Sequence, residues 1–295
     1  IMKQTSDIST AYEEFLQGNR DVKPTACGTQ SRVSDSGACL RQRGFNALQT
    51  HECHQIDTST LLAFELGTHM HNVLQEACAD QFEGEYETPI DLSYTGVSLS
   101  GSCDGLIKVN DEYRLLEIKT MSPYGFKLAR ESGVPKREHL SQASLYAKGM
   151  IEIGKQVDAV YLVYMAKGDD FRSKIKAGDI VEFVIPLDEV IYEYGMSPMQ
   201  LADAELELFR SVQQDLSNDM LPDAVLFDDN GVDTLVESPS PYGVPHKGGH
   251  WQCRYCRHNE LCQMVGPTEV TLTTARYHES LLKGDNDDIP ASQVS

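Results

Sequence analysis

Apolar residues recur along the chain with helix-like and strand-like spacing. The segment "TSTLLAFELGTHMHNVLQEACADQF" (58–82) has the apolar spacing of one long helix. The same kind of pattern predicts a helix over 137–154, and an acidic helical stretch that runs from Pro186 to about Asp219. Near the N-terminus, "SDSGACLRQRGFNAL" (34–48) is typical of the start of a capped helix.

Strand-like runs fill the middle of the chain. They are "VSLSGSCDGLIKV", "EYRLLEIKTM", "DAVYLVYMAK" and "DIVEFVIPL", and the helix over 137–154 falls between the second and the third. Strands interleaved with helices indicate a mixed α/β fold.

The same patterns divide the chain into segments. We expect a polar N-terminal segment over 1–30, a single domain over 31–275 and a flexible tail over 276–295. Within the domain, the core is predicted at about 58–190 and a cysteine-bearing segment at about 245–265.

The composition is typical of a soluble protein with a substantial core. Of the 295 residues 40% are hydrophobic, and no run of about 18 or more apolar residues is available to cross a membrane. The first residues lack the layout of a signal peptide. We therefore expect a cytoplasmic location, or the host cytoplasm if the protein is viral. In such a reducing compartment, the eight cysteines are expected to be metal ligands or core thiols.

The net charge of −20 is unevenly distributed. From Leu187 to Ser240 there are thirteen acidic residues and one basic residue, Arg210. From Tyr113 to Lys176, by contrast, there are twelve Lys and Arg residues and seven acidic ones. A locally basic region is compatible with a nucleic-acid partner, so the overall charge does not exclude DNA.

The run "GSCDGLIKVNDEYRLLEIKTM" (101–121) predicts a hairpin that places acids opposite one another. With a two-residue turn at Asn110–Asp111, Asp104 lies directly across from Glu117. Cβ atoms of such a pair are ~4.5–5.5 Å apart, so a divalent cation between the carboxylates would relieve their repulsion. Lys119 follows on the same face as Glu117. Carboxylate ligands favour Mg²⁺ or Mn²⁺, and the set is suited to phosphodiester cleavage. An exposed hairpin with a cross-strand ion pair is the alternative interpretation.

Two helical segments carry further polar residues at regular spacing. His71 on the first helix follows Gly67, where a backbone could approach closely. On the second helix His139, Gln142 and Tyr146 share one face.

The series G-T-H-M-H, G-S-C-D-G, E-I-K-T and Q-A-S-L-Y, in this order, resembles the RecB-like branch of the PD-(D/E)xK nuclease superfamily. The resemblance implies a restriction-endonuclease-like mixed sheet core flanked by helices. It also implies a metal-dependent DNA exonuclease that acts on ends, prefers single strands and proceeds 5′→3′. The pattern departs from the family at Cys103, where proline commonly precedes the aspartate.

The resemblance also implies roles for individual residues. The metal would be held by His71, Asp104, Glu117 and the backbone carbonyl of Ile118. His69 competes for the histidine position, but the spacing from Gly67 favours His71. The catalytic residues would be Lys119, Asp104, Glu117, Gln142 and Tyr146, of which Gln142 and Tyr146 line the nucleic-acid path or support the site.

"WQCRYCRHNELCQ" places three cysteines close together as C-x₂-C-x₅-C. In a reduced compartment this spacing predicts metal ligands, and a four-coordinate site needs one more. The candidates for the fourth ligand are Cys39, which is favoured, and Cys27, Cys53 and Cys78. Spacing alone leaves an iron–sulfur cluster and Zn²⁺ equally open, with His258 as a possible substitute ligand.

The cysteine pattern resembles the iron–sulfur subgroup of the same family, which includes CRISPR-adaptation and AddB-type nucleases. The resemblance implies a [4Fe–4S] cluster that joins the N-terminal and C-terminal segments through Cys39, Cys253, Cys256 and Cys262. It also implies a setting in DNA recombination, repair or CRISPR adaptation, with partner proteins from those processes.

The stretch "SPYGFKLARESGVPKREH" (122–139) is predicted to be a loop that contacts DNA phosphates, with Tyr124 and Phe126 available to stack on bases. A solvated loop without DNA contacts is the alternative interpretation. Its basic residues are Lys127, Arg130, Lys136 and Arg137, and Arg41 and Arg43 beside Cys39 are also predicted to face DNA. Glu87 is interpreted as an exposed strand acid, and an accessory acid of the site is the alternative. The competing functions are an idle nucleic-acid-binding scaffold and an iron–sulfur redox protein.

Overall fold

The computed structural model describes residues 12, 15, 16, 30–50, 52, 57–92, 97–227, 233–235 and 251–284. Most of the predicted polar segment 1–30, and residues 285–295 of the predicted tail, lie outside these residues.

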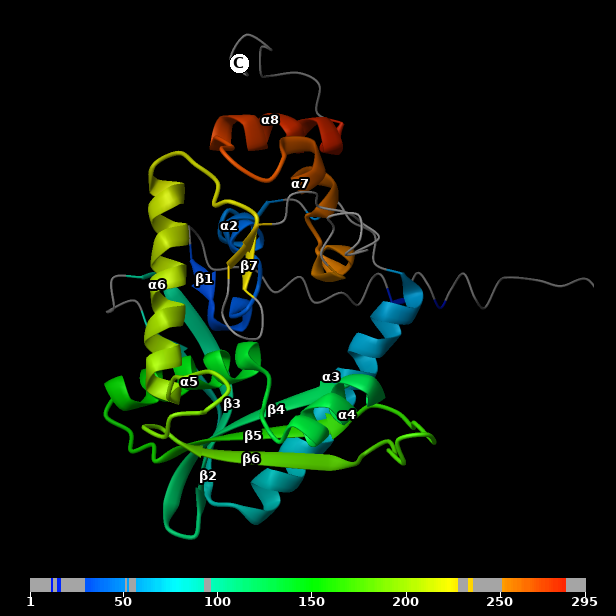
Figure 1. Ribbon diagram of the computed structural model, residues 1–295, viewed down its shortest axis with the longest axis vertical. Coiled ribbons are helices and arrows are strands. Elements are labelled where there is room, and N and C mark those ends of the chain that lie inside the picture. The colour runs from blue at the N-terminus through cyan, green and yellow to red at the C-terminus, as the bar shows by residue number, and fades with distance from the viewer. Residues whose placement is uncertain are drawn as a thin grey trace, which may run out of the picture.

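A six-stranded mixed sheet forms the centre of the fold (Figure 1). Its strands are β1 (Ser31–Arg32), β2 (Gly84–Asp91), β3 (Leu99–Val109), β4 (Glu112–Met121), β5 (Ala159–Ala166) and β6 (Ile180–Pro186). Strand β3 pairs antiparallel with β2 and β4 and parallel with β1. Strand β4 pairs parallel with β5, and β5 pairs antiparallel with β6.

The predicted hairpin is confirmed, with its register. Val109 pairs with Glu112 and Gly105 pairs with Leu116. Asn110 and Asp111 form the turn with φ angles of 52° and 67°, as a two-residue hairpin turn that follows the twist of its strands requires. The parallel pairing of β4 with β5 needs a crossover, which α4 (Pro123–Ser132) and α5 (Arg137–Glu152) supply.

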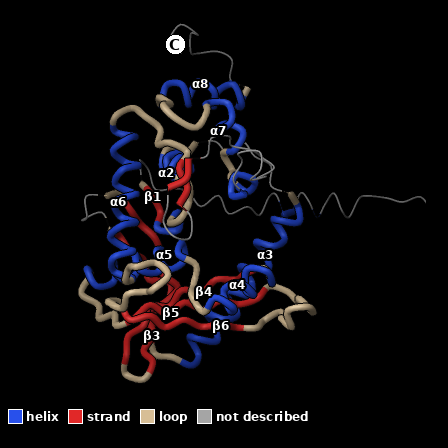
Figure 2. The backbone as a smooth tube through the Cα atoms, in the orientation of Figure 1, coloured by secondary structure: helices blue, strands red, loops and turns tan. Residues whose placement is uncertain are grey.

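Helices cover both faces of the sheet (Figure 2). On one face, Leu115 and Leu162 of the sheet pack with Leu145 of α5 and Phe209 of α6 (Pro198–Ser217). On the other face, Leu116, Ile118 and Val163 pack with Leu74 and Cys78 of α3 (Thr58–Gln81). The alternation along β4 therefore places Glu117 and Lys119 together on the face opposite to Leu116 and Ile118, as predicted. This mixed α/β arrangement is compatible with the restriction-endonuclease-like core expected from the sequence.

A second cluster of apolar side chains lies at the end of the molecule away from β4–β6 (Figure 1). It joins α2 to the end of α6 and to the two C-terminal helices, through residues that include Phe45, Val212, Leu261 and Leu272. The elements of this region are α2 (Leu40–Ala47), β7 (Val225–Phe227), β8 (Asp233–Leu235), α7 (Asn259–Val265), α8 (Leu272–Lys283) and the 3₁₀ helix η4 (Trp251–Tyr255). The 3₁₀ helix η1 (Val33–Asp35) instead joins the main core through Val33. Segments from the two ends of the chain thus share one small core.

The predicted DNA-contacting loop is in part a helix, α4. Ser122 caps it by accepting a hydrogen bond from the Gly125 amide at 3.2 Å. Pro123 occupies the first turn, and Gly133 ends the helix with a φ of 68°. Proline and glycine thus mark the two ends of a short helix in a stretch that was predicted to be a loop.

Three further boundaries differ from the predictions. Helix α6 begins at Pro198 rather than directly after Pro186, because Ser197 and Gln200 form a capping box there. Helix α8 runs to Lys283, beyond the predicted start of the tail at 276, because Leu272 and Ala275 are buried in the second cluster. Helix α2 begins after Cys39, and no side chain caps it. Within the described residues, no helix is both long and apolar enough to span a membrane.

Candidate functional site

A broad cleft opens between α3, the β2–β3–β4 part of the sheet and α5. Its lining includes His71, Asp104, Glu117, Lys119, Gln142 and Tyr146. The structure thus brings the four predicted motifs into one place, although they come from α3, β3, β4 and α5. His71, rather than His69, is the histidine that lines the cleft.

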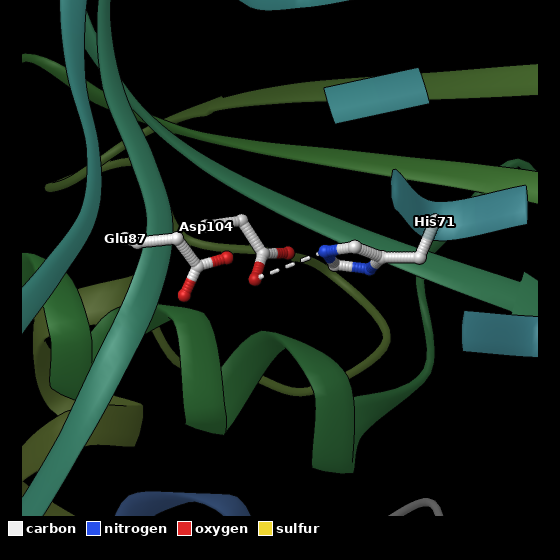
Figure 3. Close-up of side chains that lie close together, drawn as sticks. All are labelled: His71, Glu87 and Asp104. Atoms are coloured by element: carbon white, nitrogen blue, oxygen red, sulfur yellow. Dashed lines mark ion pairs between the residues drawn. The ribbon is translucent and has the colours of Figure 1, made fainter. Parts of the chain in front are cut away.

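Asp104 is at the centre of the polar groups in the cleft (Figure 3). Its Oδ1 lies 3.6 Å from Nε2 of His71. Its Oδ2 accepts a hydrogen bond from the amide of Ile118 at 2.6 Å. Burial, and then the negative charge of Glu117, raise the pKa of Asp104 from 3.8 to about 8. Bringing a cation to this carboxylate would reverse that effect, because a positive charge favours the ionised form.

Glu117 and Lys119 form a buried ion pair on β4. Nζ of Lys119 lies 2.6 Å from Oε1 of Glu117, and the glutamate side chain is only 2% exposed. The other oxygen, Oε2, is buried and has no hydrogen-bond partner among the described residues. An unsatisfied buried carboxylate oxygen is costly unless something binds it. The imidazole of His71 and the carboxylates of Asp104 and Glu117 are donors that suit a divalent cation such as Mg²⁺ or Mn²⁺. Of these three, only His71 and Asp104 belong to the group of described ligand atoms that all lie within 4.8 Å of one another.

Lys119 is oriented from the other side by α5. Its Nζ donates to Oε1 of Gln142 at 2.9 Å. The amide of Gln142 in turn donates to the hydroxyl of Tyr146 at 3.5 Å, and Tyr146 packs against Gly101, where a Cβ would come within 2.7 Å of the tyrosine ring. The predicted Lys–Gln–Tyr group is therefore brought together. The role predicted for the carbonyl of Ile118 stays a prediction.

Close packing at Gly67 explains why α3 can deliver His71 to the cleft. A Cβ atom at Gly67 would lie 2.8 Å from Oγ1 of Thr120 on β4. Lys167, just after β5, reaches the same point, and its Nζ donates to the carbonyl of Ala63 at 3.2 Å. Burial lowers the pKa of Lys167. Lys167 could not be predicted as a cleft residue from the sequence, since one lysine after a strand carries no local signal.

Glu87 also lines the cleft, although the sequence favoured only an exposed strand acid at this position. Its side chain is exposed, as expected. The ligand atoms of His71, Glu87 and Asp104 all lie within 4.8 Å of one another. The signal that was missed is the pairing of β2 with β3, which the sequence does not specify by any turn.

The four cysteines favoured for the metal cluster line one cavity, together with apolar residues such as Phe45, Ala224 and Leu226. They are Cys39, Cys253, Cys256 and Cys262. Burial raises the pKa of Cys39 and of Cys256, and the neighbouring thiols raise both further. Four thiols around an apolar cavity fit a structural iron–sulfur cluster or zinc ion.

The other candidates for this site are placed elsewhere or outside the described residues. Cys78 packs beneath the sheet with the α3 cluster. His258 contacts Asn46, with Nε2 and Oδ1 2.9 Å apart. Cys27 and Cys53 lie outside the described residues.

The prediction that Arg41 and Arg43 face DNA is wrong. Both are fully buried, at 1% and 0% exposure. Arg41 donates to the carbonyls of Gly266 and Pro267 at 2.8 and 3.0 Å, and so ties α2 to the segment between α7 and α8. Arg43 forms an ion pair of 2.7 Å with Glu205 of α6. Their positive charges are used inside the protein.

The remaining residues predicted to contact DNA lie on or just after α4, and they differ in exposure and in the contacts that they make. Tyr124 is 70% exposed, and Lys127 has a loose ion pair of 3.8 Å with Glu131. Arg130 reaches Ser173 O at 3.0 Å. Phe126, in contrast, is buried, so the expectation that it stacks on bases is wrong.

Lys136 and Arg137 are partly buried at the start of α5. Lys136 Nζ lies 3.4 Å from Glu138. The guanidinium of Arg137 lies over the ring of Tyr194, 5.8 Å from its centroid. Their DNA contacts remain predictions.

No family model matches this chain, and no curated protein matches it in sequence. Among solved structures, one similar chain is the crystal structure of SSO0001, at 16% identity and a TM-score of 0.47, covering 88% of this chain and 98% of that one. Another is an alkaline exonuclease (LHK-Exo) from Laribacter hongkongensis, at 15% identity and a TM-score of 0.39, covering 64% of this chain and 92% of that one. At these values neither likeness bears on function, which has to be inferred from the site itself.

Proposed function

We propose that this protein is a metal-dependent nuclease that hydrolyses phosphodiester bonds in DNA. The observation that carries the proposal is the buried Glu117–Lys119 pair, with one glutamate oxygen unpartnered and with Asp104 facing the same cleft. A buried carboxylate oxygen without a partner costs free energy unless something binds it, and the partly buried Asp104 places a second acid in the same cleft.

His71, Asp104 and Glu117 would hold Mg²⁺ or Mn²⁺, with the carbonyl of Ile118 as a further ligand. When bound, such an ion polarises a phosphate oxygen and lowers the pKa of a coordinated water. The Ile118 amide fixes one oxygen of Asp104, which leaves the other turned toward His71.

Lys119 holds the attacking water or steadies negative charge that develops on the phosphate. Its ammonium group is held between Glu117 and Gln142, at 2.6 and 2.9 Å. Gln142 and Tyr146 position the lysine and line the path of the nucleic acid. A cation fixed in advance contributes more than a mobile one, because no reorganisation is needed during the reaction.

The substrate would leave the cleft along α4, which begins directly after β4. Tyr124, Lys127 and Arg130 would contact the strand there, with Lys136 and Arg137 at the start of α5. The positive charge of the lysines and arginines in this set contrasts with the net charge of −20 for the whole chain. Action on DNA ends, preference for single strands and 5′→3′ direction extend the proposal on the strength of the motif order alone.

Cys39, Cys253, Cys256 and Cys262 would hold a structural [4Fe–4S] cluster, with Zn²⁺ as the alternative. The group would tie α2 to the C-terminal helices, which already share a core. Closing so long a loop removes much entropy from the unfolded chain. DNA recombination, repair or CRISPR adaptation is the proposed setting.

Digestion of DNA labelled at its 5′ or 3′ end tests the proposed function. Single- and double-stranded substrates are incubated with Mg²⁺ or Mn²⁺ and protein purified without oxygen. We expect metal-dependent release of labelled nucleotides by the wild type and none by Lys119→Ala, and the position of the label reports the direction. A metal-loaded wild type that binds both substrates and cleaves neither would instead establish an idle binding scaffold.

A further inference from the structure

Three acids lie side by side across three strands, although the proposed site uses only two of them. Asp104 is central on β3. On β2, Tyr86 pairs with Gly105 and Thr88 pairs with Cys103, so Glu87 lies opposite Asp104. On the other side, Gly105 pairs with Leu116 of β4, and Glu117 is the next residue along. Like charges in such positions destabilise a sheet.

Glu87 has an unusual backbone conformation at this point. Its φ angle is +49° in the middle of a strand, a region that a non-glycine residue enters rarely. The neighbours of Glu87 keep their pairing on both sides. The strand thus keeps its register and deforms locally at the residue beside Asp104.

No cation of the protein offsets Glu87 within the described residues. Oε1 accepts from the side-chain amide of Gln75 at 2.8 Å, and Oε2 accepts from Ser102 Oγ at 3.4 Å. The same amide of Gln75 donates to the carbonyl of Asp104 at 3.0 Å. Gln75 therefore holds the Glu87 carboxylate against Asp104, instead of letting the two acids separate into solvent.

Glu87, His71 and Asp104 converge on one point, as their ligand atoms all lie within 4.8 Å of one another (Figure 3). A second observation points to a cation in the same cleft: the orphaned Oε2 of Glu117, whose side chain is 2% exposed. The two acids differ in surroundings, because Glu117 is buried against Lys119 and Glu87 is exposed.

We propose that Glu87 is a metal-binding residue, which holds a divalent cation with His71 and Asp104 at the solvent-exposed side of the cleft. Gln75 is its positioning residue. The inference rests on the proposed function for the use of that cation, namely contact with a phosphate of the entering strand. The binding of the ion is a separate property and can be measured without DNA.

Titration of the metal-free protein with Mn²⁺, followed by electron paramagnetic resonance, tests the inference. The variant is Glu87→Gln, which removes the charge and keeps the hydrogen bond from Gln75. The matched control is Glu85→Gln, on the same strand, whose partner is Lys155. We expect Mn²⁺ binding to weaken at least about tenfold in Glu87→Gln and to stay unchanged in Glu85→Gln. Equal binding by wild type and Glu87→Gln would overturn the proposal.

Thermal unfolding gives a second readout. If Glu87 had only a structural role, its replacement by glutamine would lower the melting temperature in the absence of metal. In EDTA, Glu87→Gln should melt no lower than the wild type, because it removes a negative charge beside Asp104 and keeps the hydrogen bond from Gln75. With Mn²⁺ the wild type should gain more in melting temperature than the variant. If Glu87→Gln fails to fold, Glu87→Asn, which tolerates a positive φ, provides the same comparison.

The outcomes separate this inference from the proposed function. Mn²⁺ binding that depends on Glu87, without any DNA cleavage by the wild type, would uphold the site and refute the nuclease. Cleavage by the wild type, with Mn²⁺ binding indifferent to Glu87, would do the reverse.

Discussion

Lys119 and Glu117 are in direct contact, with Nζ and Oε1 2.6 Å apart, on a strand where apolar side chains would otherwise pack. The pair is asymmetric: the glutamate is almost fully buried, whereas the lysine is 24% exposed toward the cleft. One oxygen of the glutamate remains unpartnered among the described residues. This arrangement is compatible with the proposed metal site, and the first prediction concerns what keeps the lysine in place.

Gln142→Leu should lower the rate of DNA cleavage by about 10- to 100-fold, because misplacing a reacting group by about an ångström has effects of that size. The variant removes the acceptor that holds Lys119 Nζ at 2.9 Å. The loss should fall on kcat rather than on KM, since Gln142 acts through the lysine. Gln156→Leu, on the exposed surface, is the control. A change confined to KM would contradict the positioning role.

The contribution of His139 to the stability of the protein should fall as the pH decreases below 6.5, the ordinary pKa of a histidine. The Tyr164 hydroxyl accepts from the Lys136 amide at 2.9 Å. Nδ1 of His139 lies within hydrogen-bond distance of the same hydroxyl, at 3.0 Å. Burial, and then Lys119 and Lys136, hold the pKa of His139 well below 6.5.

The unfolded chain therefore binds a proton at His139 and the folded chain does not. The contribution of His139 to the free energy of unfolding is fully present above pH 6.5, the ordinary pKa of histidine. Below this pH the contribution is lost at about 1.4 kcal/mol per pH unit, until the pH reaches the lower pKa of the folded state. Urea unfolding of wild type and His139→Gln across this range should show a shallower slope in the variant. Parallel slopes would show that His139 is protonated in the folded protein.

Arg43→Ala and Lys127→Ala should separate stability from DNA binding. Arg43 is fully buried against Glu205, and breaking a buried pair costs about 3–5 kcal/mol. Lys127 is exposed in part and loosely paired, so its loss should leave the melting temperature unchanged. Binding of labelled single-stranded DNA in Ca²⁺ should weaken, with a smaller dependence on salt, only in Lys127→Ala. If Arg43→Ala folds but binds DNA more weakly than the wild type, Arg43 contacts DNA after all, as the sequence predicted.

Cys256→Ser should cost stability first and activity second. The wild type is expected to be brown and to hold about four iron atoms per chain, and the variant should lose both the colour and the iron. Cys78→Ser, outside the cavity, should keep them. A colourless wild type containing zinc would select the alternative metal. A stable, coloured Cys256→Ser would show that the four-cysteine site is wrong.

The features that the sequence predicted best are those set by local geometry. The turn at Asn110–Asp111 fixes the register of the β3–β4 hairpin, and a two-residue period then places Glu117 and Lys119 on one face. Helical spacing similarly put Gln142 and Tyr146 on one side of α5. These residues could be assigned to a single site because the motif order supplied the long-range contacts that spacing cannot.

The features that were missed depend on contacts between distant segments. Glu87 joins the site through β2–β3 pairing, and no turn motif in the sequence fixes that pairing. Arg41 and Arg43 look like surface cations in the sequence, yet their partners are carbonyls at 266 and 267 and the carboxylate of Glu205. A basic residue that is neutralised from so far along the chain cannot be told from a DNA contact by composition.

Single-turnover cleavage of end-labelled single-stranded DNA, by wild type and by Lys119→Ala in Mg²⁺ and in EDTA, tests the central claim most directly. Binding of the same DNA is measured in parallel to show that both proteins are folded and engaged. We predict cleavage by the wild type in Mg²⁺ only, and a loss of at least about 100-fold in Lys119→Ala with binding retained. Equal cleavage by the two proteins, or cleavage that persists in EDTA, would contradict a metal-dependent site built on Glu117 and Lys119.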